Sequence, residues 1–168
     1  MSESKKDSFI SKWRKKDSEI VQALKQIPIC ADLSRQEFGE IEKIIKQKFY
    51  KASELIFDES EMDLGLYIVL HGNIEIYSQS KKKDKLLACL KDGDFFGELT
   101  MITEKPSSAA AIAKTDSNVL AFYRSDLLDL LKKKPSTGIK ILLNLATMMG
   151  ERLRVANEIL NKERRANK

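Results

Sequence analysis

The fold of this chain is decided by the stretch Asp92-Gly93-Asp94-Phe95-Phe96-Gly97-Glu98-Leu99-Thr100-Met101-Ile102. Gly93 and Gly97 allow backbone angles that most residues avoid, so the chain can leave a strand, turn sharply and begin a short helix at Glu98. Such a turn directs unpaired N–H groups and the positive end of the helix dipole outward, which suits an anion such as phosphate. Glu98 then places a fixed acceptor beside that anion. Local chemistry leaves a second interpretation open, a buried turn whose glutamate caps the helix.

The residues after this turn extend the pattern. Phe96-Gly97-Glu98-Leu99-Thr100-Met101-Ile102 is followed by Pro106, Ser108 and Ala109. This sequence resembles the phosphate-binding cassette of the cyclic-nucleotide-binding domain family, which includes catabolite activator proteins and protein kinase A regulatory subunits. The resemblance covers roughly residues 34–160. It includes Tyr67-Ile68-Val69-Leu70-His71-Gly72-Asn73-Ile74, which is similar to the strand and glycine turn of the family's β-roll.

The resemblance implies a cyclic nucleotide ligand such as cAMP or cGMP. In the family, backbone N–H groups of the cassette bind the cyclic phosphate, the glutamate holds the ribose 2′-hydroxyl, and an arginine pairs with the phosphate charge. These places fall on the candidate ligand-binding residues Gly97, Glu98, Leu99, Ser107, Ser108 and Ala109.

Ser107 stands in the arginine's place, so the charged role falls to no cassette residue. Lys105 could reach back into the pocket, but an ammonium does not reproduce the guanidinium fork. We therefore expect Glu98 to lack a nearby cation and cAMP binding to be weak. Ser107→Arg should then strengthen binding by at least about 1.4 kcal/mol, or tenfold.

Hydrophobic periodicity predicts a mainly β protein with flanking helices. Between residues 49 and 123, β-prone runs follow one another without helical patterns, which favours an antiparallel β-roll of the double-stranded β-helix or jelly-roll type. The runs are Leu55–Phe57, Leu66–Leu70, Ile74–Tyr77, Lys85–Leu90, Ala110–Ala113 and Val119–Tyr123. Ser53 and Ser60 stand where the resemblance implies glycine, and a side chain at a left-handed position would strain or redirect the turn.

Helical patterns flank the β-prone region. Residues 9–27 predict an amphipathic N-terminal helix that Pro28 stops, and Ser34 with Glu37 forms a capping-box pattern for the next helix. A short helix begins at Asp126 and stops at Pro135. We expect three parts: an N-terminal helical extension (1–33), a roll with flanking helices (34–134), and a long C-terminal helix with a basic tail (135–168).

The last helix carries two apolar seams and so predicts a dimer. The β-roll can cover one seam and a second copy the other, which predicts a homodimer through the Ile139–Leu160 helix. Arg152 interrupts the second seam. The first seam is Ile139, Leu142, Ala146, Met149, Leu153, Ala156 and Leu160, and the second is Ile141, Leu145, Met148, Val155 and Ile159.

Composition limits the possible partners and compartments. The 168-residue chain has a net charge of +5, with +4 in residues 1–16 and +3 in residues 162–168, which leaves −2 for the body. Such charged ends are more often solvated termini than a docking face, and weak electrostatic attraction to an acidic partner stays open. Residues 161–168 are too few for a helix-turn-helix, so direct sequence-specific DNA binding is disfavoured. The sequence has neither a membrane span nor a signal peptide, and Cys30 and Cys89 suit buried thiols, so a cytoplasmic protein is expected.

Two functions stay open from the sequence. The first is a regulatory or sensory domain, without a DNA-binding or catalytic module, that couples pocket occupancy to the C-terminal helix. The second is a degenerate roll that binds no nucleotide and acts as a dimeric protein-interaction scaffold. An enzyme is disfavoured because we find neither a nucleophile and base pair nor metal-ligand spacing, and we interpret His71, the sole histidine, as a turn residue before Gly72. We therefore expect no catalytic residue, no metal and no cofactor.

Overall fold

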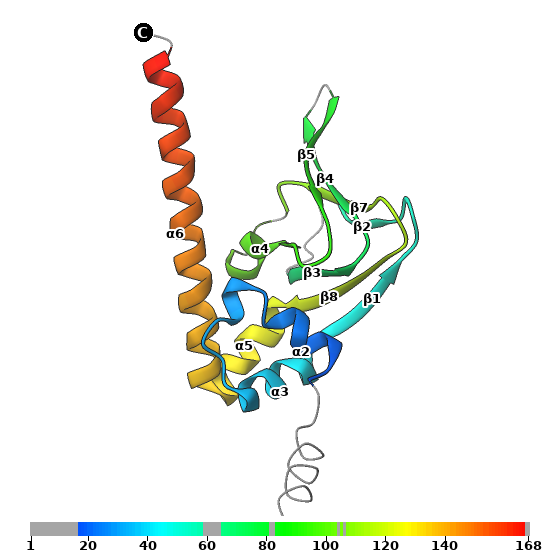
Figure 1. Ribbon diagram of the computed structural model, residues 1–168, viewed down its shortest axis with the longest axis vertical. Helices are drawn as coiled ribbons and strands as arrows, with labels where there is room; N and C mark the ends of the chain where they lie inside the picture. The colour runs from blue at the N-terminus through cyan, green and yellow to red at the C-terminus, as the bar shows by residue number, and fades with distance from the viewer. Residues whose placement is uncertain (1–16, 59–64, 81–82, 104, 106, 167–168) are drawn as a thin grey trace, which may run out of the picture.

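The computed structural model describes residues 17–58, 65–80, 83–103, 105 and 107–166 (Figure 1). Its strands form two four-stranded antiparallel sheets, which confirms the predicted antiparallel β-roll. One sheet has the order β1 (Lys46–Tyr50), β8 (Ser117–Tyr123), β3 (Gly65–His71) and β6 (Phe95–Phe96). The other has the order β2 (Leu55–Phe57), β7 (Ala110–Ala113), β4 (Ile74–Ser80) and β5 (Lys83–Leu90).

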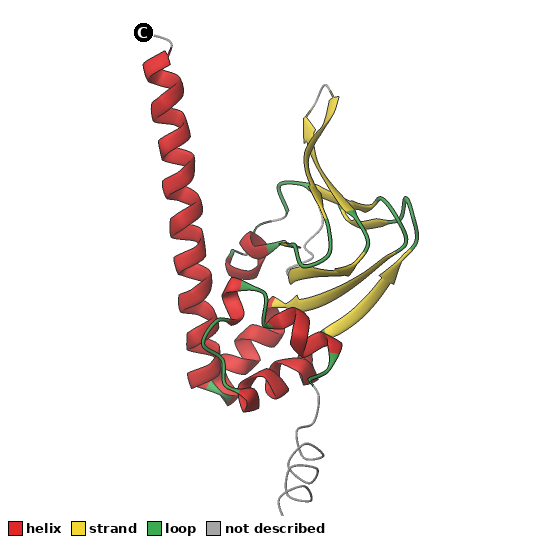
Figure 2. Ribbon diagram, viewed as in Figure 1, coloured by secondary structure: helices red, strands yellow, loops and turns green. Residues whose placement is uncertain are grey.

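Helices gather at one end of the roll, and α6 rises from them beside the roll (Figure 2). The expected N-terminal helices and long C-terminal helix are confirmed, and the 3₁₀ helix η1 lies between α2 and α3. The helices are α2 (Glu19–Leu24), η1 (Pro28–Cys30), α3 (Arg35–Ile44), α4 (Glu98–Ile102), α5 (Arg124–Lys133) and α6 (Pro135–Ala166).

Strand β3 separates two hydrophobic cores. Its side chains alternate between the faces of the sheet, as the two-residue period of a strand requires. Leu66 and Ile68 belong to the cluster that the helices cover, whereas Tyr67 and Val69 belong to the cluster inside the roll. All four are at most 1% exposed, so β3 is buried on both faces and reads as a continuous apolar run.

The N-terminal helix is shorter than predicted within the described residues. Ser18 caps α2, and its Oγ accepts a hydrogen bond from the Val21 N–H at 3.1 Å. Helix α2 ends at Leu24, and Pro28 begins η1 instead of stopping a helix, because proline is tolerated at the first position of a helical turn. The predicted helix residues before Asp17 lie outside the described part of the chain.

The second helix follows its predicted start. Ser34 and Glu37 form the full capping box of α3, with the Ser34 N–H donating to Glu37 Oε2 at 2.7 Å. The short helix begins at Arg124, two residues before the predicted Asp126, and Asp126 occupies its third position. Pro135 is the first residue of α6. The break at Lys134 therefore separates two helices that the chain joins directly.

Two sequence expectations about single residues have different outcomes. Ser53 has φ +70°, so it adopts the left-handed backbone conformation that favours glycine, whereas Ser60 lies outside the described residues. Cys30 is buried as expected, but Cys89 is exposed. Cys89 lies on β5, an edge strand of its sheet, so the prediction of two buried thiols is wrong for this residue.

Helix α6 packs on the body only over its first half. Ile141 and Leu145 are fully buried, and Met148 packs against the same core. Asn144 fixes this half to η1, because its Nδ2 donates to the backbone oxygens of Ala31 at 2.8 Å and Ile29 at 3.3 Å. The described residues from 150 to 165 are all exposed, and this half of the helix rises beside the roll (Figure 1).

The prediction that the β-roll covers one seam therefore needs a correction. The first half of the second seam is buried among helices and the outer face of the β3 sheet. Its second half, Val155 and Ile159, is about as exposed as Leu153 and Leu160 of the first seam.

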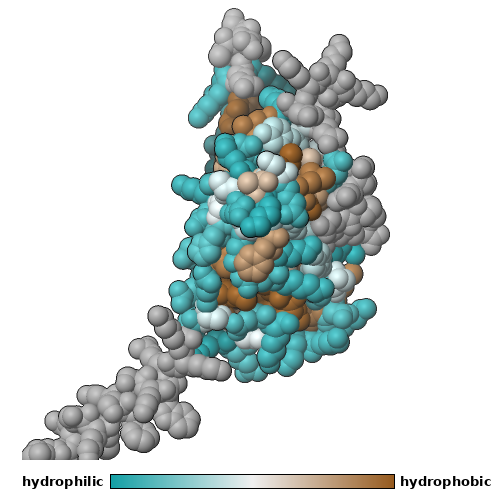
Figure 3. Space-filling model, turned by 90° about the vertical axis from the view of Figure 1, so that its right-hand side faces the viewer, coloured by the Kyte–Doolittle hydropathy of each residue, from teal (hydrophilic) through white to brown (hydrophobic). Residues whose placement is uncertain are grey.

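The face of the roll away from α6 is mostly hydrophilic, with its apolar residues in separate patches (Figure 3).

Candidate functional site

The predicted ligand-binding residues share one cavity. It has a volume of about 590 Å³ and lies between the end of β6, helix α4, the loop before β7 and the inner side of β4 and β5. All six candidates line it: Gly97, Glu98, Leu99, Ser107, Ser108 and Ala109. The structure thus places them together, while their role in binding a ligand stays a prediction.

The turn at Gly97 positions the cassette. Gly97 has φ +82° and caps α4, and an added Cβ would lie 2.3 Å from the Gly65 carbonyl oxygen. Thr100 holds the two segments together, because its hydroxyl accepts the Gly65 N–H at 3.1 Å and lies 2.8 Å from the Gly97 carbonyl oxygen. The sequence interpretation did not identify Thr100, a buried polar residue that joins β3 to the cassette.

On the other side of the cassette, the Ser107 side chain forms hydrogen bonds with the backbone of its own loop. Its Oγ donates to the Ala109 carbonyl oxygen at 2.6 Å and accepts the Ala109 N–H at 3.2 Å. The short side chain therefore satisfies the loop's own backbone. In the place where the family resemblance implies an arginine, the cassette gains a local turn and no charge.

Helix α6 contributes a cation to this cavity. Arg152 Nη1 pairs with Glu98 Oε1, and both residues line the cavity. The Glu98 side chain is only 12% exposed, and the Arg152 guanidinium carbon lies 5.4 Å from the centre of the Phe95 ring. The expectation that Glu98 lacks a nearby cation is therefore wrong. The sequence did contain a signal, because Arg152 is the residue that interrupts the second apolar seam.

The strands contribute apolar side chains to the cavity. Phe57 of β2 and Phe96 of β6 line the cavity, and so do residues of β4 and β5. The Phe96 ring stacks on the Tyr67 ring, with 5.2 Å between the ring centres. Leu87 and Leu99 are about half exposed and also line the cavity. Polar groups at one end of an apolar cavity fit a ligand with an anionic end and a flat apolar part.

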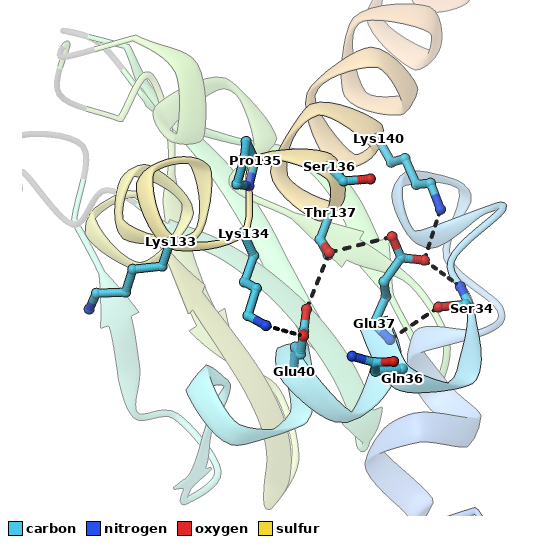
Figure 4. Close-up of a pocket in the computed structure, with 10 residues that line it drawn as sticks. All are labelled: Ser34, Gln36, Glu37, Glu40, Lys133, Lys134, Pro135, Ser136, Thr137 and Lys140. Atoms are coloured by element: carbon cyan, nitrogen blue, oxygen red, sulfur yellow. Dashed lines mark hydrogen bonds and ion pairs between the residues drawn. The ribbon is translucent and has the colours of Figure 1, made fainter.

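A second cavity, of about 430 Å³, lies where α3 meets the joint between α5 and α6 (Figure 4). Several of the polar groups around it are paired with one another. Glu37 Oε2 accepts from Lys140 Nζ at 2.8 Å, and the hydrogen bond from Lys140, followed by that from the Ser34 N–H, lowers the pKa of Glu37 to about 2. Glu40 pairs with Lys134 at 3.1 Å. These contacts fix α6 to α3, so we assign this cavity a structural role.

His71 ends strand β3 and lies between two carboxylates. Its Nε2 is 2.6 Å from Glu19 Oε1 and its Nδ1 is 3.3 Å from Asp92 Oδ2. Its hydrogen bond to Glu19, and then that to Asp92, raises the pKa of His71. Within the described residues, no cluster of histidine, cysteine and acidic side chains could hold a metal, and no helix there combines the length and apolar character needed to cross a bilayer.

Comparison with known proteins places the cassette in a family. The family model described as Cyclic nucleotide-binding domain matches residues 47–134, just over half of the chain. The chain belongs to this family. The match includes the whole cassette, whereas Arg152 lies beyond it.

Relatives in this family cover most of the chain. The Cyclic AMP receptor protein of Thermus thermophilus is 28% identical over 80% of this chain and 61% of its own length. A cAMP-dependent protein kinase regulatory subunit of Yarrowia lipolytica is 29% identical over 57% of this chain and 25% of its own. The crystal structure of the Thermus thermophilus Catabolite Activator Protein superposes with a TM-score of 0.71, at 28% identity over 80% of this chain and 62% of that one. This chain thus spans less than two thirds of these relatives.

Proposed function

We propose that this protein is a regulatory module that binds a cyclic nucleotide, cAMP or cGMP, in the cassette cavity and couples its occupancy to α6. One observation carries the proposal: the cavity that contains all six cassette residues is also lined by Arg152 of α6. A ligand that fills the cavity would therefore touch the roll and the helix together. Any difference in its affinity between two positions of α6 would shift the helix.

The chemistry of the cavity supports this ligand class. The start of α4 at Gly97 directs backbone N–H groups toward an anion, and Glu98 offers a carboxylate for a ribose hydroxyl. The apolar wall suits a base. Both relatives described above, the Cyclic AMP receptor protein and the cAMP-dependent protein kinase regulatory subunit, are named for cyclic AMP. We assign the module no catalytic role and no direct DNA contact, and we place it in the cytoplasm, where its free thiols Cys30 and Cys89 stay reduced.

Calorimetric titration tests this function. The natural protein and Ser107→Arg are each titrated with cAMP, cGMP and cyclic dinucleotides, and with linear AMP as the control ligand. Saturable heat with a cyclic mononucleotide and not with AMP supports the proposal. If neither protein binds any cyclic nucleotide, the proposed function is wrong.

A second candidate function is favoured by one separate observation. The outer half of α6 exposes four large apolar side chains, with between 47% and 63% of each accessible: Leu153, Val155, Ile159 and Leu160. A chain with this surface and no nucleotide would act as a dimeric scaffold for protein partners. Titration without binding, together with a stable dimer, would favour this second function.

A further inference from the structure

We propose that Arg152 supplies the cation that the cassette lacks, so that the cavity binds a cyclic phosphate only when α6 lies against it. This inference rests on the proposed function and names the residue that carries the phosphate charge. The positive charge then comes from α6, which lies outside the matched residues 47–134, and not from the cassette loop, where Ser107 is uncharged.

Position and chemistry favour Arg152 over the other candidate. Among the described residues that line the cavity, Lys105 and Arg152 are the cationic ones. Arg152 is held at the cavity by its ion pair with Glu98 and by the Phe95 ring. Its planar guanidinium presents five N–H donors, so it can meet a phosphate while keeping a contact to Glu98. Lys105 offers a single ammonium on a flexible stem.

The location of Arg152 on α6 links binding to the helix position. Packing of α6 on the main core extends to Met148, one helical turn before Arg152, and residues 150–162, 164 and 165 are exposed. Arg152 therefore touches the cassette from a part of the helix that has little other support. A phosphate bound to Arg152 favours this position of α6 over any position that removes the guanidinium from the cavity.

The chain offers a matched control for the charge. Arg154 lies two residues further along α6 and pairs within the helix, with Glu151 at 2.9 Å and Glu158 at 2.7 Å. It does not line the cavity. Arg154→Ala removes the same charge from the same exposed half of the helix, and so controls for net charge and for helix stability.

The test is titration with cAMP of the natural protein, Arg152→Ala, Arg152→Lys, Arg154→Ala and the double variant Arg152→Ala with Ser107→Arg. We expect Arg152→Ala to weaken binding by at least about tenfold, since a charge-assisted phosphate contact is lost. Arg152→Lys should lie in between, Arg154→Ala should match the natural protein, and the double variant should recover affinity.

The outcomes separate this inference from the proposed function. Equal binding by the natural protein and Arg152→Ala overturns the inference and leaves the function standing. Binding only by variants that carry Ser107→Arg also overturns it, because Arg152 then fails to supply the charge. Binding by no variant ends the proposed function, and the inference with it.

Amide hydrogen exchange supplies the second readout. With cAMP bound, residues 149–156 of α6 should exchange more slowly in the natural protein than without the ligand. In the double variant cAMP should bind without this protection, because the charge then belongs to the cassette. Equal protection of α6 in both proteins would show that the coupling does not pass through Arg152.

Discussion

Gly97 permits the cassette turn because it lacks a side chain. Its φ of +82° lies in the left-handed region, and the Gly65 carbonyl oxygen occupies the space where a Cβ would be. Backbone angle and close approach therefore both require glycine. Gly93 shares the left-handed angle, at φ +87°, but the nearest atom to an added Cβ is Gln26 Oε1 at 3.7 Å.

We predict that Gly97→Ala lowers the free energy of unfolding by about 3 kcal/mol, since it adds a clash to the left-handed strain. Gly93→Ala adds only the left-handed strain and no clash, so it should lower the free energy of unfolding by about 1 kcal/mol. Urea unfolding at neutral pH measures both variants. Equal losses would show that the approach to Gly65 does not constrain the turn.

The cassette residues could be predicted from the sequence because their geometry is local. Gly97 and Glu98 are neighbours, and the turn they form depends on backbone angles within a few residues. Arg152 lies 54 positions from Glu98, and its contact depends on how α6 packs across the helical end of the roll. Nothing in local spacing determines that packing. The sequence therefore shows that Arg152 interrupts the seam, but it does not show that Glu98 is the partner of Arg152.

His71 gives the protein a pH-dependent contact between α2 and the roll. Glu19 and Asp92 face its two ring nitrogens, and both contacts favour the imidazolium form, which raises the pKa above its ordinary value of 6.5. The stabilisation is therefore complete below pH 6.5 and is lost as the pH rises through the raised pKa.

We predict that the natural protein melts above His71→Gln at about pH 5.5, and that the difference shrinks toward about pH 9. Thermal melts of both proteins across this range measure it. A difference that stays constant with pH would mean that the imidazolium is not the stabilising form.

At the scale of elements, α3 and α6 are joined by buried polar contacts. Glu37 is 9% exposed and accepts from Lys140 of α6, while Thr137 donates toward Glu37 at 3.4 Å and Glu40 at 3.2 Å (Figure 4). Glu37 also completes the capping box of α3. The Glu37 carboxylate thus caps the N-terminus of α3 and also binds Lys140 near the start of α6.

We predict that Glu37→Gln lowers the free energy of unfolding by about 1–3 kcal/mol at pH 7, because Lys140 loses its charged partner. The pKa of Glu37 is lowered from 4.5 to about 2, so its contribution is present above pH 4.5 and declines as the pH falls toward 2. Urea unfolding at several pH values should show the gap between the two proteins closing in acid.

Gln36→Ala is the control for this change, because Gln36 lines the same cavity but is exposed. Its effect should stay within about 0.5 kcal/mol. A Glu37→Gln variant as stable as Gln36→Ala would contradict the structural role of the joint.

Strands were predictable where side chains alternate or run apolar over several residues. Leu55–Phe57 and Ala110–Ala113 have the predicted bounds. Strand β6 has two residues, Phe95 and Phe96, and exists through its pairing with β3, which no periodicity in two residues can reveal. The exposure of Cys89 likewise follows from the edge position of β5 in its sheet, which is set by strand order.

At the scale of the whole molecule, the two halves of α6 differ in their surroundings. The first half packs into the helical core through Ile141 and Leu145, and the second half presents Leu153 and Leu160 of the first seam to solvent. Exposed apolar side chains that recur along one helix face are typical of an interface. A second copy of the chain carries the same seam, so an antiparallel or parallel pair of α6 helices could bury it on both sides.

We therefore predict a homodimer at micromolar concentration that Leu153→Asp converts to monomer, since the aspartate would place a charge within the buried seam. Light scattering coupled to size exclusion measures the mass. Asn161→Asp adds the same charge at an exposed position outside both seams and should leave the dimer intact. A natural protein that is monomeric at every concentration would rule out the interface. A dimer that persists in Leu153→Asp would show that the interface does not depend on the first seam of α6.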